Sequence, residues 1–382
     1  MLRVLYIADV NMFANNGGGL CNLSCYNAVC KIFPENVDLM HAEEYIPLNY
    51  NNINIIPVPR MSNLHRGFNL IRGRIHRLNP FAIKYITKNY TKYSLCIING
   101  GITAGDMIDK IKSLGLKTVV IHHNFETDYQ IFNKTLMSFY GLMPYYIIRN
   151  EKKAFLKADI NYFLTSYDKI KFYESYGLPL GLCDIIGCFE TCDKQMDLNN
   201  FYSEPKTIVI SGSLNFRQTT DGIIDFFKNY YSDAINLDPN IKVLITGRNP
   251  VKAILELKNE FDNIEICINP ENINSIVQRG CIYLCPISAG GGIKLRIMDG
   301  LRLGLPILTH EKSVRGYESF LNKKYFKTYK DLDTFKKSFK DLMNLIEMKK
   351  NDNFQIQQDY LDTYSFNAGV KRFEKLLNQY KK

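Results

Sequence analysis

Continuous apolar runs alternate with stretches of helical spacing along most of this chain. Runs of this kind are typical of strands that are buried on both faces of a parallel sheet. They predict strands at residues 2–7, 53–58, 95–99, 117–122, 158–164, 207–210, 243–246, 264–268 and 281–287. Glycine-led turns and helical spacing predict helices at about 20–32, 100–114, 166–176 and 221–230. Strands that alternate with helices require right-handed crossovers, so the pattern predicts an α/β fold.

The pattern breaks between residues 179 and 205, which we interpret as a linker between two similar halves. A chain of 382 residues is long enough for two cores of nearly equal size. We expect two Rossmann-like, doubly wound domains at residues 1–190 and 191–360, followed by a helical segment at 361–382. Ligands of such sheets bind beyond the carboxyl ends of the strands, so we expect an interdomain cleft as the binding site.

A glycine-rich turn after the apolar run at 281–287 carries the strongest functional pattern. Glycine lets backbone N–H groups approach a phosphate closely, and the dipole of the helix predicted next favours negative charge. A lysine in the first helical turn adds a mobile ammonium, and a carboxylate further along can accept bonds from sugar hydroxyls. The turn predicts a nucleotide-diphosphate site, although such turns also occur in α/β proteins that bind nothing there. The candidate donor-binding residues here are Gly290, Gly291, Gly292, Ile293, Lys294 and Asp299.

This segment resembles the signature of retaining GT-B glycosyltransferases, specifically the large GT4-type family. That signature has two glutamates separated by seven residues, followed by a Gly-x-Pro-Val strand. Asp299 stands at the second glutamate position, and Gly304, Pro306 and Ile307 fit the strand. Gly291 stands at the first glutamate position, where the family contacts the donor sugar. The resemblance therefore implies a sub-branch in which backbone amides take over more of that contact.

The resemblance covers nearly the whole chain and implies site residues in the first half. Gly17, Gly18 and Gly19 resemble the family's first glycine-rich loop, where the donor phosphate and the acceptor meet. A plain strand-to-helix turn is the alternative. The C-terminal segment has apolar residues at helical spacing. In the family such a helix crosses back onto the first domain.

A histidine pair ends the predicted strand at 117–122. His123 resembles the family's histidine that follows an N-domain strand and hydrogen-bonds the donor sugar near the reacting carbon. The adjacent His122 is the alternative, because only one of two neighbours on a strand can face the cleft. Glu126 lies in the same loop, where it can orient the imidazole or remain a solvated loop acid.

The first turn of the second half departs from the family pattern. The family places an arginine and a lysine there to hold the diphosphate, and this chain has Ser213 and Asp221 instead. We therefore expect Lys294 to hold the phosphates, with Arg217 in support. Arg248 follows the next strand, in a loop that lies beside the nucleobase in the family. The candidate donor-binding residues of this region are Gly212, Ser213, Arg217 and Arg248.

The resemblance implies chemistry that requires neither a cofactor nor a metal. In the front-face mechanism attributed to this family, the leaving diphosphate helps to deprotonate the incoming hydroxyl. The protein stabilises the charge that develops on the phosphate, which helix N-termini and a lysine can do. Because no DxD-type motif for a divalent ion stands out, we expect metal-independent transfer. The catalytic candidates are His123, Lys294 and Glu126.

A net charge of +10 and a pI of about 8.9 indicate an acidic partner. The densest basic stretch, residues 60–77, interleaves apolar residues and predicts an amphipathic segment on an anionic membrane surface. A solvated helix face is the alternative. No nucleic-acid module is visible, so nucleic acid is not an expected partner. The basic positions of this stretch are Arg60, His65, Arg66, Arg72, Arg74, His76 and Arg77.

The ten cysteines lie mostly in apolar runs or on predicted helices. This context favours reduced thiols and a cytoplasmic protein, and the basic stretch is compatible with a peripheral position on the inner face of the plasma membrane. Cys183, Cys188 and Cys192 cluster near the predicted linker, and a metal there is an alternative. No uninterrupted apolar stretch reaches the length of a transmembrane helix, and the first residues predict a strand rather than a signal peptide.

Three functions fit the sequence. The first is a retaining glycosyltransferase that moves a sugar from a nucleotide-diphosphate sugar to a saccharide or lipid-linked hydroxyl acceptor in bacterial cell-surface glycan synthesis. The second is another GT-B enzyme, such as a sugar-nucleotide epimerase or a phosphorylase. The third is a catalytically degenerate GT-B partner subunit. The aromatic and basic segment at 132–155, with Tyr145 and Tyr146, can line an acceptor site or form an ordinary amphipathic helix.

Overall fold

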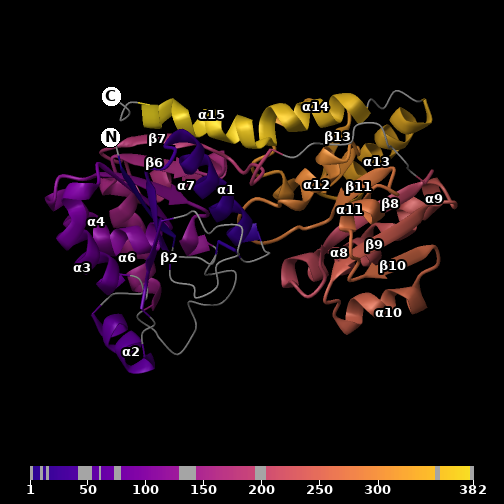
Figure 1. Ribbon diagram of the computed structural model, residues 1–382. Helices are drawn as coiled ribbons and strands as arrows, with labels where there is room; N and C mark the ends of the chain where they lie inside the picture. The colour runs from indigo at the N-terminus through magenta and orange to yellow at the C-terminus, as the bar shows by residue number, and fades with distance from the viewer. Residues whose placement is uncertain are drawn as a thin grey trace. The chain divides into compact units, whose positions relative to one another are not determined.

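The computed structural model describes residues 3–8, 12–13, 17–41, 54–59, 62–72, 79–128, 143–193, 204–348 and 353–378. The chain forms two compact units. Unit 1 comprises Met1–Lys194 together with Tyr364–Lys382, and unit 2 comprises Gln195–Thr363. Each unit is an α/β structure built on one parallel sheet (Figure 1).

Unit 1 contains a seven-stranded sheet in the order β3-β2-β1-β4-β5-β6-β7. All of its strand pairs are parallel. The strands are β1 (Val4–Ala8), β2 (Val37–His41), β3 (Asn54–Pro57), β4 (Leu95–Asn99), β5 (Lys117–His122), β6 (Ile160–Phe163) and β7 (Leu182–Ile185). The strand order reverses between β1 and β4, which is where doubly wound sheets bind ligands.

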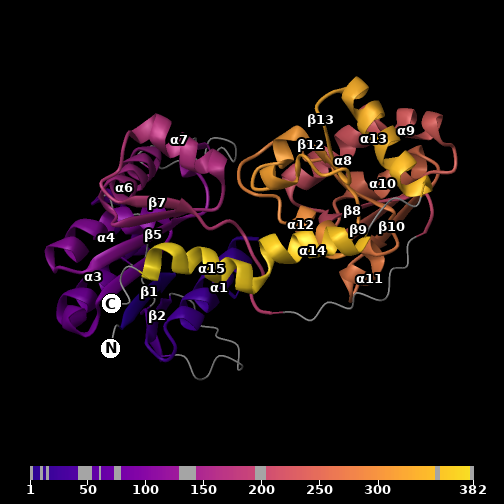
Figure 2. The same ribbon diagram turned by 90° about the horizontal axis from the view of Figure 1, so that it is seen from above.

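The helices of unit 1 cover both faces of this sheet (Figure 2). The helices that cover it are α1 (Gly17–Ile32), α3 (Asn79–Asn89), α4 (Gly101–Ser113), α6 (Met143–Lys157), α7 (Ser166–Tyr176) and α15 (Phe366–Leu377), and the unit also contains α2 (Asn63–Ile71). Alternate residues of β1 serve the two faces: Leu5 and Ile7 pack in the cluster that includes α3, α4 and α6, whereas the Tyr6 ring meets Tyr26 of α1. Burial on both faces explains why these strands are continuously apolar.

Unit 2 contains a six-stranded parallel sheet in the order β10-β9-β8-β11-β12-β13. The strands are β8 (Thr207–Ser213), β9 (Lys242–Arg248), β10 (Ile264–Ile268), β11 (Ile282–Cys285), β12 (Ile307–His310) and β13 (Phe326–Tyr329). The helices are α8 (Arg217–Asn229), α9 (Tyr231–Leu237), α10 (Lys252–Glu260), α11 (Ile273–Val277), α12 (Arg296–Arg302), α13 (Leu332–Glu347) and α14 (Asn353–Tyr364). Here the strand order reverses between β8 and β11, and the glycine-rich turn follows β11.

The helix α15 packs within unit 1 against α1 and against the chain that follows β7. Arg372 donates hydrogen bonds to the carbonyl oxygens of Ile186 and Cys188, and the Phe189 ring lies against Gly369. On the other side of that chain, Ser24 of α1 donates to the carbonyl oxygen of Phe189 at 2.9 Å. The C-terminal helix and α1 therefore hold residues 186–189 between them.

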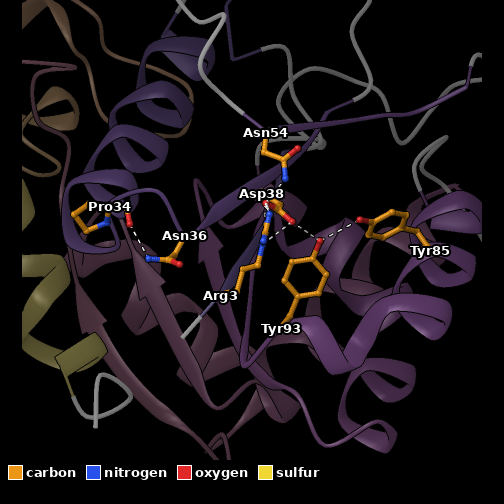
Figure 3. Close-up of polar contacts among 7 residues, drawn as sticks. All are labelled: Arg3, Pro34, Asn36, Asp38, Asn54, Tyr85 and Tyr93. Carbon is orange, nitrogen blue, oxygen red and sulfur yellow. Dashed lines mark hydrogen bonds and ion pairs between the residues drawn. The ribbon is translucent and has the colours of Figure 1, made fainter. Parts of the chain in front are cut away.

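A polar cluster around the buried Asp38 fixes the register of β1, β2 and β3 at their amino ends (Figure 3). Arg3 pairs with Asp38 at 2.7 Å, and Asn54, the register partner of Asp38, donates to it at 2.7 Å. The hydroxyl of Tyr93 donates to the same carboxylate at 2.6 Å and bonds Tyr85. Burial opposes ionisation of Asp38, but these donors outweigh it and hold its pKa below the ordinary value.

Several predicted elements differ from the structure. The stretch predicted as a linker contains the strand β7, whose flanking Pro179, Gly181 and Gly187 suggested irregular chain. The strands β2 and β13 and the helices α3 and α13 were not predicted. The helix after the glycine-rich turn begins at Arg296, so Lys294 lies before the helix and not in its first turn.

Candidate functional site

The predicted donor-binding residues of unit 2 gather beyond the carboxyl ends of β8, β9 and β11. Gly212 and Ser213 end β8, Arg248 ends β9, and the glycine-rich turn follows β11. Ser213 and Arg248 are register partners on neighbouring strands. The parallel sheet thus brings together residues that are far apart in the sequence.

The glycine-rich turn requires glycine for geometric reasons. Gly290 and Gly292 have φ values of +89° and +72°, a region that side chains disfavour. A Cβ on Gly290 would also lie 2.0 Å from Nε2 of Gln218, which belongs to α8. The turn is therefore packed against the start of α8, and a side chain at Gly290 would displace it.

Lys294 lies underneath this turn, with 7% of its surface exposed. Its ammonium donates to Oε1 of Gln218 at 3.1 Å, and to the carbonyl oxygens of Gly291 at 2.8 Å and of Gly292 at 3.5 Å. The hydroxyl of Tyr317 donates to the Lys294 carbonyl oxygen at 2.8 Å. Lys294 and Gln218 thus connect the turn to α8 and place a positive charge beneath it.

Arg296 is a basic residue of this edge that the sequence prediction missed. A Cβ on Gly212 would lie 3.0 Å from the Arg296 guanidinium carbon, so the guanidinium covers the end of β8. A Cβ on Gly247 would lie 1.7 Å from the Gly212 carbonyl oxygen, because the two strand ends approach closely. The spacing of Lys294 and Arg296, two residues apart, was the available sequence signal.

Two of the remaining charged candidates of unit 2, Arg217 and Asp299, have partners on their own helices. Arg217, the first residue of α8, is exposed and bonds Asp221 at 3.3 Å. Asp299, in the first turn of α12, pairs with Arg302 at 2.8 Å. Arg248 is exposed at the end of β9. Ile293, next to Lys294, is half-buried.

In unit 1, the candidate glycines form the first turn of a helix and not a separate loop. Gly17, Gly18 and Gly19 begin α1, which runs for 16 residues. Gly17 and Gly18 are exposed and Gly19 is buried. The first N–H groups of a helix have no partner within it, and its dipole attracts anions.

The two histidines at the end of β5 occupy different environments. His122 is 2% exposed and packs among Phe155, Phe163 and Phe172. Burial lowers its pKa to about 4, so His122 is a neutral core residue at physiological pH. His123 is half-buried beyond the strand, and its Nε2 hydrogen-bonds Oδ1 of Asn99, which ends β4. His123 is therefore the histidine placed at the carboxyl edge.

Two buried carboxyl groups hold the loop that carries His123 and Glu126. Glu151 of α6 accepts a hydrogen bond from the Glu126 amide at 2.7 Å and one from the Tyr176 hydroxyl at 2.8 Å. Asp168 of α7 accepts one from the Phe125 amide at 3.0 Å. Burial raises the pKa of Glu151 to about 8. No sequence motif marked Glu151, because its role depends on contacts with distant residues.

The predicted acceptor segment is described only from residue 143 onwards, as α6. Tyr145 is exposed, and the Tyr146 hydroxyl bonds the carbonyl oxygen of Ile71 at 3.4 Å. Arg149 lies over the Tyr146 ring, 5.0 Å from its centre. These contacts join α6 to the end of α2, the helix of the basic stretch. The parts of that stretch at residues 60–61 and 73–78 lie outside the described part of the chain.

The described residues include no group of three or more His, Cys, Asp and Glu side chains arranged to hold a metal ion. Cys188, one of the three cysteines predicted to cluster, instead lies against Cys21 of α1, with their Sγ atoms 3.3 Å apart. Among the helices described, none is both long and apolar enough to cross a bilayer.

Comparison with solved structures finds the same two-unit architecture in glycosyltransferases. A structure of Anabaena Alr3699/HepE in complex with UDP and glucose aligns with a TM-score of 0.65 at 10% identity, over 99% of this chain and 100% of that one. A glycosyltransferase from Rickettsia africae ESF-5 aligns with a TM-score of 0.68 at 11% identity, over 100% and 99%. Sucrose-phosphate synthase from Thermosynechococcus elongatus aligns with the same TM-score, identity and coverage.

This chain therefore has the GT-B fold, as the sequence predicted. No protein-family model matches the sequence, and no curated protein matches it either. At these identities the structural likeness defines the fold alone.

Proposed function

We propose that this protein is a glycosyltransferase of the GT4 type that uses a nucleotide-diphosphate sugar and retains the anomeric configuration. The observation that carries the proposal is the glycine turn of unit 2, with the Lys294 ammonium beneath it and the start of α8 beside it. UDP and glucose bound to the similarly folded HepE support a nucleotide-sugar donor.

The arrangement suits the stabilisation of a leaving diphosphate. The amino end of α8, which has 13 residues, contributes a dipole worth about 0.3–1 kcal/mol for a nearby anion. Lys294 and Arg296 add positive charge next to it, and Arg217 and Arg248 extend that charge along the same edge. Fixed donors of this kind favour charge that develops during the reaction, because they need no reorganisation. Transfer with retention then requires no nucleophile from the protein.

His123 and Glu126 are the proposed catalytic residues of unit 1. We place the His123 ring against the donor sugar, with Glu126 in the same loop. The first turn of α1 offers the amides of Gly17 and Gly18 to an anionic group. The buried Glu151 and Asp168 position this loop through its backbone amides.

We further propose that transfer is independent of divalent metal. The positive groups around the glycine turn supply the charge that a metal would otherwise provide. Activity should persist in excess chelator, whereas loss of activity that added magnesium or manganese restores would contradict the proposal.

We propose a lipid-linked or saccharide acceptor, used in bacterial cell-surface glycan synthesis at the inner face of the plasma membrane. The helix α2 supports this location, because Leu64, Phe68 and Ile71 are 80%, 63% and 72% exposed. Their spacing puts them on one side of the helix, and His65 and Arg72 are exposed beside them. Binding to anionic vesicles should weaken in Phe68→Ser but not in Leu180→Ser, a control at a leucine that is 88% exposed.

A degenerate partner subunit is the second candidate. It is favoured by Gly291 at the position of the first family glutamate and by the pairing of Asp299 with Arg302. Product formation by the purified chain alone would exclude it.

The test is release of nucleotide diphosphate by the purified chain, supplied in chelator with uridine, guanosine or adenosine diphosphate sugars and with saccharide or lipid-linked acceptors. We expect turnover with one base. It should fall at least about tenfold in Lys294→Met, since one buried charged hydrogen bond is worth roughly that factor. The control Lys252→Met changes a lysine that is exposed on α10. Absence of release with every donor would contradict the proposed activity.

A further inference from the structure

A buried chain of hydrogen bonds leads from His123 across the sheet to α1. His123 Nε2 bonds Oδ1 of Asn99, at the end of β4. Asn99 Nδ2 donates to the Tyr6 hydroxyl of β1 at 2.6 Å. That hydroxyl donates to the carbonyl oxygen of Asn22 at 3.4 Å and to its Oδ1 at 3.3 Å. Asn99, Tyr6 and Asn22 are each fully buried.

The carbonyl oxygen of Asn22, which ends this series of hydrogen bonds, determines the direction of every bond in the series. A backbone carbonyl oxygen can only accept, so Tyr6 must give its single proton to Asn22. Burial raises the pKa of the Tyr6 hydroxyl well above its ordinary value, which keeps that proton in place. Toward Asn99, the hydroxyl can then only accept.

Asn99 must therefore turn its amino group to Tyr6 and its carbonyl oxygen to His123. An oxygen acceptor facing His123 requires a proton on Nε2. In the neutral ring, Nδ1 then carries the lone pair. The protonation pattern of His123 thus follows from the carbonyl group of Asn22, which is connected to it through Asn99 and Tyr6.

We propose that Asn99 and Tyr6 are positioning residues that fix His123 as the Nε2–H tautomer, so that the neutral ring meets its substrate as a hydrogen-bond acceptor at Nδ1. The chemical group recognised there is a hydroxyl, which can donate, and not an unprotonated phosphate oxygen, which cannot. The assignment of that hydroxyl to a sugar rests on the proposed function. The tautomer itself does not.

The neighbouring histidine provides an internal control. His122 Nε2 bonds Oδ1 of Asn161 at 2.9 Å, and Asn161 Nδ2 donates to the carbonyl oxygen of Phe155 at 3.0 Å. By the same reasoning His122 is also an Nε2–H tautomer. The hydrogen bonds of His122 involve none of the residues that connect His123 to Asn22. A change in Tyr6 or Asn99 should therefore leave the NMR signals of His122 in place.

The test is long-range proton–nitrogen NMR of the full chain labelled with 15N-histidine, with His123 signals assigned from the spectrum of His123→Gln. We expect the protonated form at Nε2 to exceed the other tautomer by at least about tenfold, because the alternative would leave a buried acceptor facing a lone pair. Tyr6→Phe removes the acceptor of Asn99 Nδ2, so both tautomers should appear. Asn99→Asp keeps an oxygen acceptor and should retain the Nε2–H form.

Unchanged His122 signals in each variant show that the fold is intact. A wild-type His123 protonated at Nδ1, or an Nε2–H form that persists undiminished in Tyr6→Phe, would overturn the proposal. If glycosyl transfer is observed, Tyr6→Phe should lower kcat more than it raises the KM of the donor. If no transfer is observed, the proposed function fails while the tautomer result still stands or falls by the spectra.

Discussion

The Lys294 ammonium lies 2.8 Å from the carbonyl oxygen of Gly291, three residues earlier in the chain. The carbonyl oxygens of the glycine turn thus hold the Lys294 ammonium in place, and the ammonium in return stabilises the conformation of the turn. A family-based expectation would have this lysine only as a contact to phosphate. In this structure it also maintains the shape of the turn.

Replacing Lys294 by methionine should therefore affect stability as well as nucleotide binding. The change leaves the half-buried carbonyl group of Gly291 without its donor, which costs about 1–3 kcal/mol of the free energy of unfolding. Denaturant unfolding of the ligand-free protein measures this loss in the free energy of unfolding. Lys252→Met, at an exposed lysine, should stay within about 0.5 kcal/mol of the wild type. An unchanged unfolding free energy in Lys294→Met would mean that the ammonium does not support the turn.

Gly290→Ala should destabilise unit 2 and weaken nucleotide binding together. The new Cβ would lie 2.0 Å from Gln218 Nε2, at a backbone φ of +89°. We expect a loss of about 1–3 kcal/mol in unfolding free energy. Gly67→Ala is the matched control, because no atom lies within 4 Å of its Cβ and alanine favours the helix by roughly 1 kcal/mol. Equal effects of the two changes would refute the packing argument.

The buried Glu151 should make stability fall as the pH rises. Its pKa is raised to about 8 in the folded protein, so between its ordinary value near 4.5 and 8 the folded state binds the extra proton. Over that range this group alone should lower the unfolding free energy by up to about 1.4 kcal/mol per pH unit. Glu151→Gln mimics the neutral acid and should flatten the dependence, which urea unfolding across this range would reveal. If the unfolding free energy of Glu151→Gln fell with pH as steeply as that of the wild type, the pH dependence would come from other groups.

Asp38 should make the protein less stable as the pH falls into the acid range. Its pKa is lowered in the folded state, so its stabilising effect is present above the ordinary value near 3.8 and is lost as the pH falls through the folded value. Asp38→Asn should cost about 1–3 kcal/mol at pH 7 and weaken the acid dependence. Glu256→Gln, which removes an exposed helix pair with Lys252, should cost less than about 0.5 kcal/mol. Similar losses in both variants would contradict the role given to the cluster in Figure 3.

The two parallel sheets could be predicted because their central strands are buried on both faces and are continuously apolar. Strands such as β4 and β5 match the predicted ranges for this reason. The edge strand β7 is half-exposed, and glycine and proline flank it, so it lacks that signature. The helix α8 begins four residues before the prediction, because its first turn is polar and has no capping side chain bond.

The candidate site was less accessible to sequence reasoning. The glycine turn and Lys294 could be found because they are adjacent in the chain. Arg296 was marked only by its spacing from Lys294. Nothing in the sequence marked Gln218, since its position depends on how α8 packs at the sheet edge. The choice between His122 and His123 required the burial of each ring. Asp299 was expected to face a sugar, and its pairing with Arg302 appears only in three dimensions.

The most direct measurement is thermal unfolding of the wild type and of Lys294→Ala with UDP, GDP, ADP and CMP, all in chelator. A nucleotide present at 100 times its Kd stabilises the protein by roughly 2.7 kcal/mol, which is several degrees for a domain of this size. We expect a rise in Tm with one nucleotide diphosphate, and a much smaller rise in Lys294→Ala. A Tm that no nucleotide changes, or a rise that survives the loss of Lys294, would contradict the donor site proposed around the glycine turn.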